Sequence, residues 1–165
     1  MDTDWMSGSD FLLLEAGYSP LMIASQGEHY GVVSSIITEG ADANFRGPKG
    51  ETPLLLAVRH AHKNMEAAIQ IVALLVEHGA NVNAATNDGE TCVTRAAVLN
   101  YPKLLRYLVD NGGDVNSTST GGDTPISYVE SFAVHRGKRK QVLKILEDAG
   151  GIRKGPSVTD KSSDT

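Results

Sequence analysis

Aromatic residues and cysteine are scarce in this sequence of 165 residues. Aromatic side chains make up 5% of the chain, so we expect a core built from aliphatic side chains. The single cysteine, Cys92, cannot form a disulfide within the chain, which favours a reducing compartment such as the cytoplasm. The sequence also begins without the basic segment and the apolar stretch of a secretory signal. We therefore expect a cytoplasmic protein.

Long apolar runs and an excess of positive charge are absent as well. The longest uncharged apolar runs, such as residues 71–76, are far shorter than the roughly 20 residues of a membrane-spanning helix. The 20 acidic and 15 basic residues give a formal net charge of −5, which disfavours binding to nucleic acid or to an anionic membrane. The content of 41% hydrophobic and 21% charged residues is typical of a globular domain, and 17 glycines predict frequent turns.

An internal repeat organises the chain. A motif of the form Gly-x-Thr-Pro-Leu, clearest at residues 50–54, occurs four times with small variations. The spacings between successive copies are 33, 39 and 33 residues. The four copies begin at Gly17, Gly50, Gly89 and Gly122.

A second motif, of the form Gly-Ala-Asp-Val-Asn, follows in each unit. Apolar pairs precede its glycine by seven to eight and by three to four residues, which places them on one face of a helix. We expect this helix to end at the glycine in a left-handed conformation. The proline of the first motif predicts a shorter helix before it. The second motif begins at Gly40, Gly79, Gly112 and, in degraded form, Gly150.

These two phased motifs resemble those of the ankyrin repeat family, whose units have about 33 residues. The resemblance implies an all-α solenoid of four helix-turn-helix repeats joined by β-turn loops. Residues 1–16 would form an N-terminal capping segment, and residues 153–165, which have almost no apolar content, a flexible tail. The repeats would span residues 17–49, 50–88, 89–121 and 122–152.

Repeats 2 and 4 are longer than the other two. Repeat 2 has six extra residues within 59–68, and repeat 4 has five around 133–140. We expect both insertions to lie between the two helices of a repeat or to extend them. At the chain ends, residues 11–14 are expected to cover the core of the first repeat with Trp5 beside them. Glu147 replaces an apolar residue and indicates a polar C-terminal cap.

No group of residues has the spacing of a catalytic or metal site. His60 and His62 are two residues apart, so they do not share a helical face, and no cysteine or carboxylate completes a tetrahedral set. Cys92 occupies a packing position of the repeat. The sequence has no glycine-rich phosphate loop and no visible pair of catalytic carboxylates. We expect no enzyme activity, no metal or cofactor, and no small-molecule substrate.

One dense basic run is present. It could contact an acidic partner or a phosphate, or it could be a solvated helix face without a partner. The negative net charge and the lack of interleaved aromatic residues favour the second interpretation. The run comprises Arg136, Lys138, Arg139 and Lys140, with Arg153 and Lys154 nearby.

The resemblance implies that a partner protein binds in a concave groove lined by turn tips and by the ends of the first helices. The candidate residues at the turns are Tyr18, Phe45, Arg46, Lys49, Glu51, Thr86, Asn87, Asp88, Glu90, Ser119, Thr120 and Asp123. Those at the ends of the first helices are Ser25, Gln26, Arg59, His60, Val98 and Leu99, with Tyr101 as a neighbouring aromatic residue.

The sequence therefore predicts a protein–protein interaction module, with a monomer favoured. Phe45 is a candidate anchor, since aromatic side chains often dominate interface energy. The acidic row of Glu51, Glu90 and Asp123 would suit a basic partner. Two alternatives are an inhibitor of the immunity or antitoxin type that occludes an enzyme's active site, and an effector that captures a host protein. An enzyme that uses the insertions as a catalytic edge is a third, different class.

Overall fold

The computed structural model describes residues 4–132 and 138–153. These residues form nine helices and no strand, which confirms the all-α fold class. The chain divides into two compact units, residues 1–87 and 88–165.

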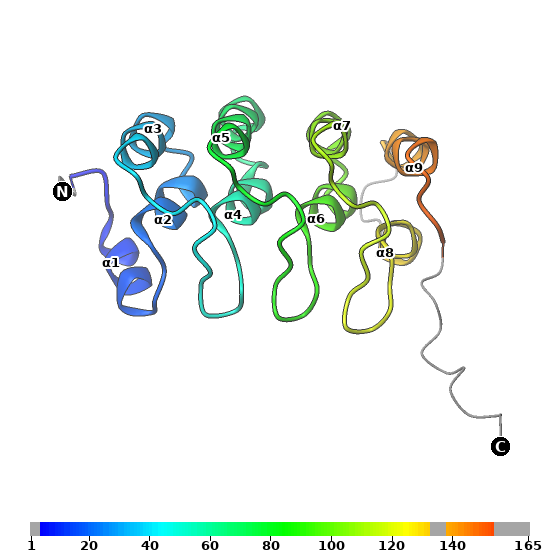
Figure 1. Cartoon of the computed structure of the whole chain (residues 1–165), viewed down its shortest axis with the longest axis horizontal. Coiled ribbons are helices and arrows are strands. Elements are labelled where there is room, and N and C mark those ends of the chain that lie inside the picture. The colour runs from blue at the N-terminus through cyan, green and yellow to red at the C-terminus, as the bar shows by residue number, and fades with distance from the viewer. Residues whose placement is uncertain (1–3, 133–137, 154–165) are drawn as a thin grey trace, which may run out of the picture. The chain divides into compact units, whose positions relative to one another are not determined.

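The first unit contains helices α1 to α5 (Figure 1). α2 packs against both α3 and α4, and α5 packs against α3 and α4, so that α2 and α4 form one layer and α3 and α5 another. The bounds are Gly8–Glu15 for α1, Pro20–Gln26 for α2, Tyr30–Thr38 for α3, Pro53–His60 for α4 and Met65–Glu77 for α5.

The second unit repeats this arrangement with α6 to α9. α6 packs against α7 and α8, while α9 packs against α7 and α8. The bounds are Cys92–Val98 for α6, Pro102–Asp110 for α7, Pro125–Phe132 for α8 and Arg139–Asp148 for α9.

The serine or threonine of the first motif caps the N-terminus of each short helix with its side-chain hydroxyl. In α4, the side chain of Thr52 accepts a hydrogen bond from the backbone N–H of Leu55 at 3.3 Å. Pro53 follows at the first helical position, where its missing N–H costs nothing. Equivalent bonds run from Met22 N to Ser19, from Thr94 N to Thr91 and from Ser127 N to Thr124.

The longer helices end at the glycine of the second motif. All four glycines have positive φ angles between 82° and 95°, as predicted. The residue after the glycine donates its N–H to a carbonyl five residues earlier, for example Ala80 to Leu75 at 2.9 Å. This closes the helix end with satisfied carbonyl groups. The four glycines are Gly40, Gly79, Gly112 and Gly150.

The cores of both units are aliphatic and follow the predicted helical face. In each longer helix, apolar side chains three to four residues apart are buried against the shorter helices. The buried residues of these helices are Val33, Ile36 and Ile37 in α3, Ala68, Ile71, Val72 and Leu75 in α5, Leu104, Leu105 and Leu108 in α7, and Val142, Ile145 and Leu146 in α9. Cys92 is also fully buried.

The insertion of repeat 2 mainly lengthens α5, which has 13 residues where α3 has nine. Of the two expected arrangements, between the helices or as an extension of them, the insertion of repeat 2 mainly takes the second. The residue just before α5 is hydrogen-bonded to the preceding repeat: the backbone N–H of Asn64 donates to a carboxylate oxygen of Glu28 at 3.0 Å. Residues 133–137 of the other insertion lie outside the described residues.

The N-terminal segment differs from the expectation. No residue of α1 is buried, and Phe11 and Leu12 are 47% and 66% exposed, so these two side chains do not cover the core of the first repeat. Leu13 and Leu14 are half-buried, and α1 contacts α2. The Trp5 ring contacts that of His29, just before α3, edge-on with a distance of 5.6 Å between ring centroids.

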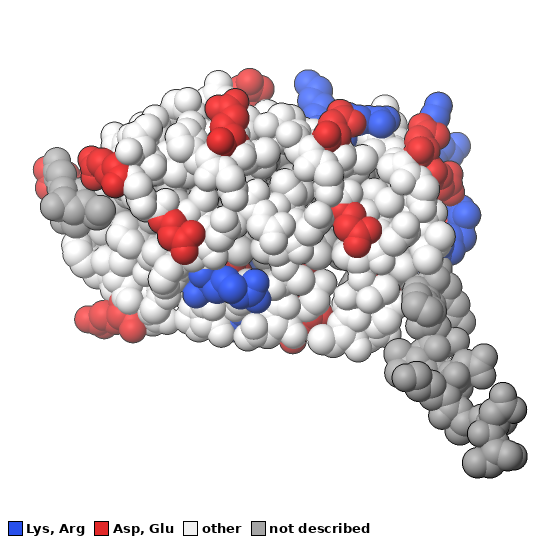
Figure 2. Space-filling model, viewed as in Figure 1, with Lys and Arg blue, Asp and Glu red and all other residues white. Residues whose placement is uncertain are grey.

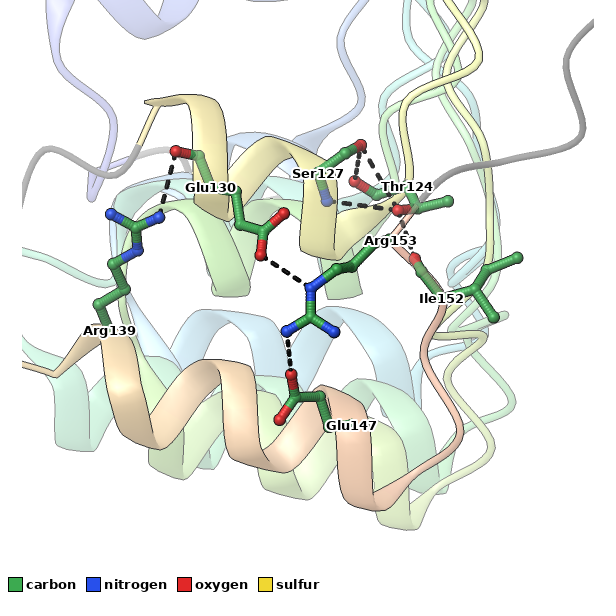
Figure 3. Close-up of polar contacts among 7 residues, drawn as sticks. All are labelled: Thr124, Ser127, Glu130, Arg139, Glu147, Ile152 and Arg153. Atoms are coloured by element: carbon green, nitrogen blue, oxygen red, sulfur yellow. Dashed lines mark hydrogen bonds and ion pairs between the residues drawn. The ribbon is translucent and has the colours of Figure 1, made fainter.

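Side chains of the last repeat and Arg153, the residue that follows it, join α8 to α9 (Figure 3). Arg153 donates to the carboxylates of Glu130 in α8 and Glu147 in α9, at 3.0 and 2.5 Å. Arg139 donates to the backbone carbonyl of Glu130 at 3.2 Å. The polar position predicted at Glu147 thus forms part of a bridge between the two helices.

In the described ranges, 4–132 and 138–153, no helix combines the length and the apolar character needed to cross a membrane.

We expect Gly79→Ala to destabilise the fold by about 1–2 kcal/mol, because an L side chain strains the left-handed conformation at φ +82°. Gly31→Ala is the matched control. Gly31 lies inside α3, and a Cβ added at either glycine meets no atom within 4 Å. This control should stabilise by roughly 0.5–1 kcal/mol through helix propensity. Urea unfolding followed by circular dichroism measures both changes, and equal effects of the two variants would contradict the assignment.

Candidate partner-binding surface

The repeats are joined by tight hairpin turns whose backbone is hydrogen-bonded. In the first unit, Gly47 N donates to the carbonyl of Glu51 at 2.8 Å, and Gly50 N donates to that of Gly47 at 2.9 Å. The turn at residues 119–123 of the second unit has the same two bonds, at 3.0 and 2.9 Å. The same pair of backbone hydrogen bonds thus closes both turns.

Neighbouring turns within a unit are also bonded to each other. In the first unit, Asn87 N donates to the carbonyl of Lys49 at 2.9 Å, and a guanidinium N–H of Arg46 donates to the carbonyl of Ala85 at 2.8 Å. In the second unit, Thr120 N donates to the carbonyl of Asp88 at 3.1 Å. Side chains at the turn tips are thus held on a rigid backbone.

An asparagine in the second motif links each of two repeats to the next. Asn44 donates its side-chain amide to the carbonyl of Gly79 at 2.9 Å and accepts from Asn81 N at 2.7 Å. In the second unit, Asn116 donates to the carbonyl of Gly150 at 3.1 Å and accepts from Ile152 N at 2.8 Å. Sequence reasoning assigned no role to these asparagines, although they recur at the same place in the motif.

Tyr18, Glu51 and Arg59 form a polar cluster in the first unit. The Tyr18 hydroxyl donates to Glu51 Oε1 at 3.1 Å, and Arg59 Nη1 lies 3.5 Å from the same oxygen. The backbone N–H of Lys49 donates to Glu51 Oε2 at 3.1 Å. Since the Glu51 side chain is only 2% exposed, its carboxylate interacts with the donors of this cluster and not with solvent.

This cluster shifts the pKa values of its members. Burial raises the pKa of Glu51, but hydrogen bonds from its own backbone N–H, from Lys49 N and from Tyr18, together with the charge of Arg59, outweigh burial and hold the pKa below its usual value. The pKa of Tyr18 is raised by burial and by the neighbouring Glu51 carboxylate. At the end of α4, burial and then the charge of Lys63 lower the pKa of His60.

The candidate residues of the second unit are less buried. Glu90 forms an ion pair with Arg95, and Asp123 accepts a hydrogen bond from the Ser127 hydroxyl at 3.4 Å. The side chains at the end of α6 and just before α7 are half-buried, namely Val98, Leu99 and Tyr101. Ser119 is half-buried, and Asp88 and Thr120 are exposed.

A family model for ankyrin repeats, in three copies, matches residues 21–119. The chain belongs to the ankyrin repeat family. Repeats of this family generally act as protein–protein interaction modules, which agrees with the coarse function inferred from the sequence.

The chain is also similar to curated ankyrin repeat proteins from distant organisms. It is 37% identical over 95 residues to an ankyrin repeat protein of Fowlpox virus (strain NVSL), covering 54% of this chain and 26% of that protein. It is 35% identical over 96 residues to an ankyrin repeat-containing protein of Treponema pallidum (strain Nichols), covering 58% and 30%. Similarity to the human Ankyrin repeat and MYND domain-containing protein 1 is 27% over 111 residues, covering 61% and 11%. The chain thus spans less than a third of each of these relatives.

Three of the candidate contact residues of this ankyrin repeat chain are buried. Ser25 is fully buried and donates to the carbonyl of Leu21 in its own helix at 2.7 Å. Glu51 and Thr86 are 2% and 8% exposed. None of the three offers contact area to a partner, so we exclude them from the candidate surface.

The remaining candidates of the first unit form two groups. Phe45, Arg46, Lys49 and Asn87 are exposed at the turns, and Phe45 is 39% exposed despite its aromatic ring. Tyr18, Gln26, Arg59 and His60 are half-buried. On the face that Figure 2 shows, acidic and basic side chains are interspersed and most of the surface is uncharged.

We expect Glu51→Gln to destabilise the protein by about 1–3 kcal/mol at neutral pH, because a buried, hydrogen-bonded carboxylate loses its charge. The folded-state pKa of Glu51 is lowered, so its contribution is present above the unfolded-state pKa and is lost as pH falls through the folded-state pKa. The difference between wild type and variant should therefore shrink below about pH 4.

Urea unfolding at several pH values measures this difference. Glu77→Gln, at an exposed position at the end of α5, is the matched control and should leave the free energy of unfolding within about 0.5 kcal/mol of wild type. A gap between Glu51→Gln and wild type that stays constant down to pH 2 would contradict a role for the Glu51 charge.

Proposed function

We propose that this chain binds a partner protein through its hairpin tips and the adjoining ends of the first helices, and that Phe45 is an anchor of that contact. It acts by binding and has no catalysis of its own. The observation that carries the proposal is an exposed aromatic side chain on a turn whose backbone is fixed by hydrogen bonds.

A small pocket beside Phe45 supports this proposal. Its volume is about 110 Å³, and its lining is mostly apolar, with Pro20, Leu21, Ile36 and Ala41 beside the Phe45 ring. An apolar side chain of a partner would fill this pocket while it packs on the ring. Because the turns are already ordered, binding would cost little conformational entropy.

The charges of the tips do not favour a basic partner. Glu51 is buried in its cluster and Glu90 is paired with Arg95, so two members of the predicted acidic row are engaged within the fold. Lys49 and Arg46 are exposed at the tips of the first unit. An acidic row would have suited an inhibitor of a basic enzyme, and no observation favours the inhibitor alternative over a general binding role.

Phe45→Ala should remove a partner that the wild-type chain retains. Loss of an aromatic anchor typically costs 2 kcal/mol or more, which corresponds to roughly thirtyfold weaker binding. Affinity capture with quantitative mass spectrometry, followed by direct titration of each captured protein, measures the loss.

Tyr30→Ala is the matched control, since Tyr30 is also aromatic and 44% exposed but lies at the start of α3, away from the turns. Its set of captured proteins should equal that of wild type. If Phe45→Ala and wild type capture the same proteins with the same affinity, Phe45 is not an anchor and the proposal is wrong.

A further inference from the structure

An open groove of about 620 Å³ lies between the two longer helices of the second unit. α7 contributes Pro102, Lys103 and Arg106, and α9 contributes Gln141, Lys144, Ile145 and Asp148. The groove is separate from the hairpin tips, because it is built entirely by second helices of the repeats. Three of its four charged residues are basic, in a chain whose formal net charge is −5.

The basic side chains of this groove are not engaged within the fold. Within the part of the chain that the structure describes, Lys103, Arg106 and Lys144 form no ion pair and no side-chain hydrogen bond, and all three are exposed. Arg139 and Arg153 behave differently, since both bond to α8 or α9 in the closure of the last repeat (Figure 3). Figure 2 shows Lys and Arg side chains over the region of α7 and α9, with Asp and Glu side chains among them.

The repeat itself places these charges together. Arg106 and Lys144 each precede the second-motif glycine of their repeat by six residues, so they occupy the same repeat position on adjacent helices. Like charges on packed neighbours repel each other, and they favour an anion that lies between them. The groove floor is apolar, with Ile145 only 7% exposed and Pro102 half-buried.

We propose that the α7–α9 groove binds an acidic, amphipathic segment of a partner protein. Acidic side chains of that segment would pair with Lys103, Arg106 and Lys144, and its apolar side chains would pack on Pro102 and on the methylene groups of the lysine side chains. A helix with apolar residues at intervals of three and four fits a groove between two helices. Asp148 lies in α9 one turn beyond Lys144 and disfavours acidic side chains at that end, which gives the segment a preferred direction.

The groove suits a protein segment better than a nucleic acid. No aromatic side chain lines it, so it lacks the stacking surface on which single-stranded nucleic acid depends. Asp148 would also repel a uniformly charged phosphate backbone. An oligonucleotide is therefore the competing ligand in the test.

The test is fluorescence anisotropy with the full chain and three labelled probes. The first is a synthetic amphipathic peptide with leucine at intervals of three and four and glutamate elsewhere. The second is the same peptide with lysine in place of glutamate, and the third is a single-stranded DNA oligonucleotide of similar length. We expect saturable binding of the acidic peptide alone, weakened severalfold between about 50 and 500 mM salt.

Charge reversal locates the binding. Arg106→Glu and Lys144→Glu should each lower the affinity for the acidic peptide by roughly tenfold, and the double variant should abolish binding. Lys63→Glu is the matched control, because Lys63 is exposed between α4 and α5 in the first unit and its reversal makes the same change in net charge. Its affinity should equal that of wild type. Circular dichroism verifies the fold, and Arg106→Gln with Lys144→Gln replaces the double reversal if that variant unfolds.

Four outcomes would overturn the proposal. They are no saturable binding of the acidic peptide, equal affinity of wild type and the charge-reversal variants, loss of affinity in Lys63→Glu, and binding of the oligonucleotide in place of the peptide. The Phe45→Ala variant should bind the acidic peptide as wild type does, so failure of this inference and failure of the proposed tip contact are distinguishable.

Discussion

Each repeat of this protein depends on its neighbours, because it is too small to bury an apolar face by itself. Its first helix has seven or eight residues, which is shorter than an isolated helix needs in water. Stability therefore comes from apolar side chains shared between adjacent helices and from hydrogen bonds that join one repeat to the next. Asn44 illustrates the second contribution, since its single side chain satisfies a donor and an acceptor at the end of the following repeat.

The same dependence explains why residues at the turns divide into two roles. Glu51 lies at a turn but is buried, because its carboxylate joins Tyr18 of one repeat to Arg59 of the next. Phe45 lies close by, and no such bond of its side chain holds the turn, so substitution there should leave the fold intact. The rigidity that the Phe45 contact needs is thus supplied by its neighbours and not by Phe45 itself.

The repeat pattern in the sequence was sufficient to predict the fold class, the helix ends and most of the core. The left-handed conformation of Gly79 and the burial of Leu75 follow from local sequence patterns that recur in each repeat. The candidate surface was less predictable, because burial of Ser25 depends on packing that no motif encodes. The α7–α9 groove was missed for another reason. Arg106 and Lys144 are 38 residues apart, and a search for continuous basic runs overlooks one cation per repeat.

The extra length of α5 shows how such a chain can accept an insertion. α5 exceeds α3 by four residues, which is close to the 3.6 residues of one helical turn. The added turn therefore returns the apolar side chains to the same angular position, and Ala68 extends the stripe that Ile71, Val72 and Leu75 already form. An insertion of two residues would instead rotate everything before it by about half a turn and aim polar side chains into the core. The extra length of α5 therefore preserves the angular phase of its buried face.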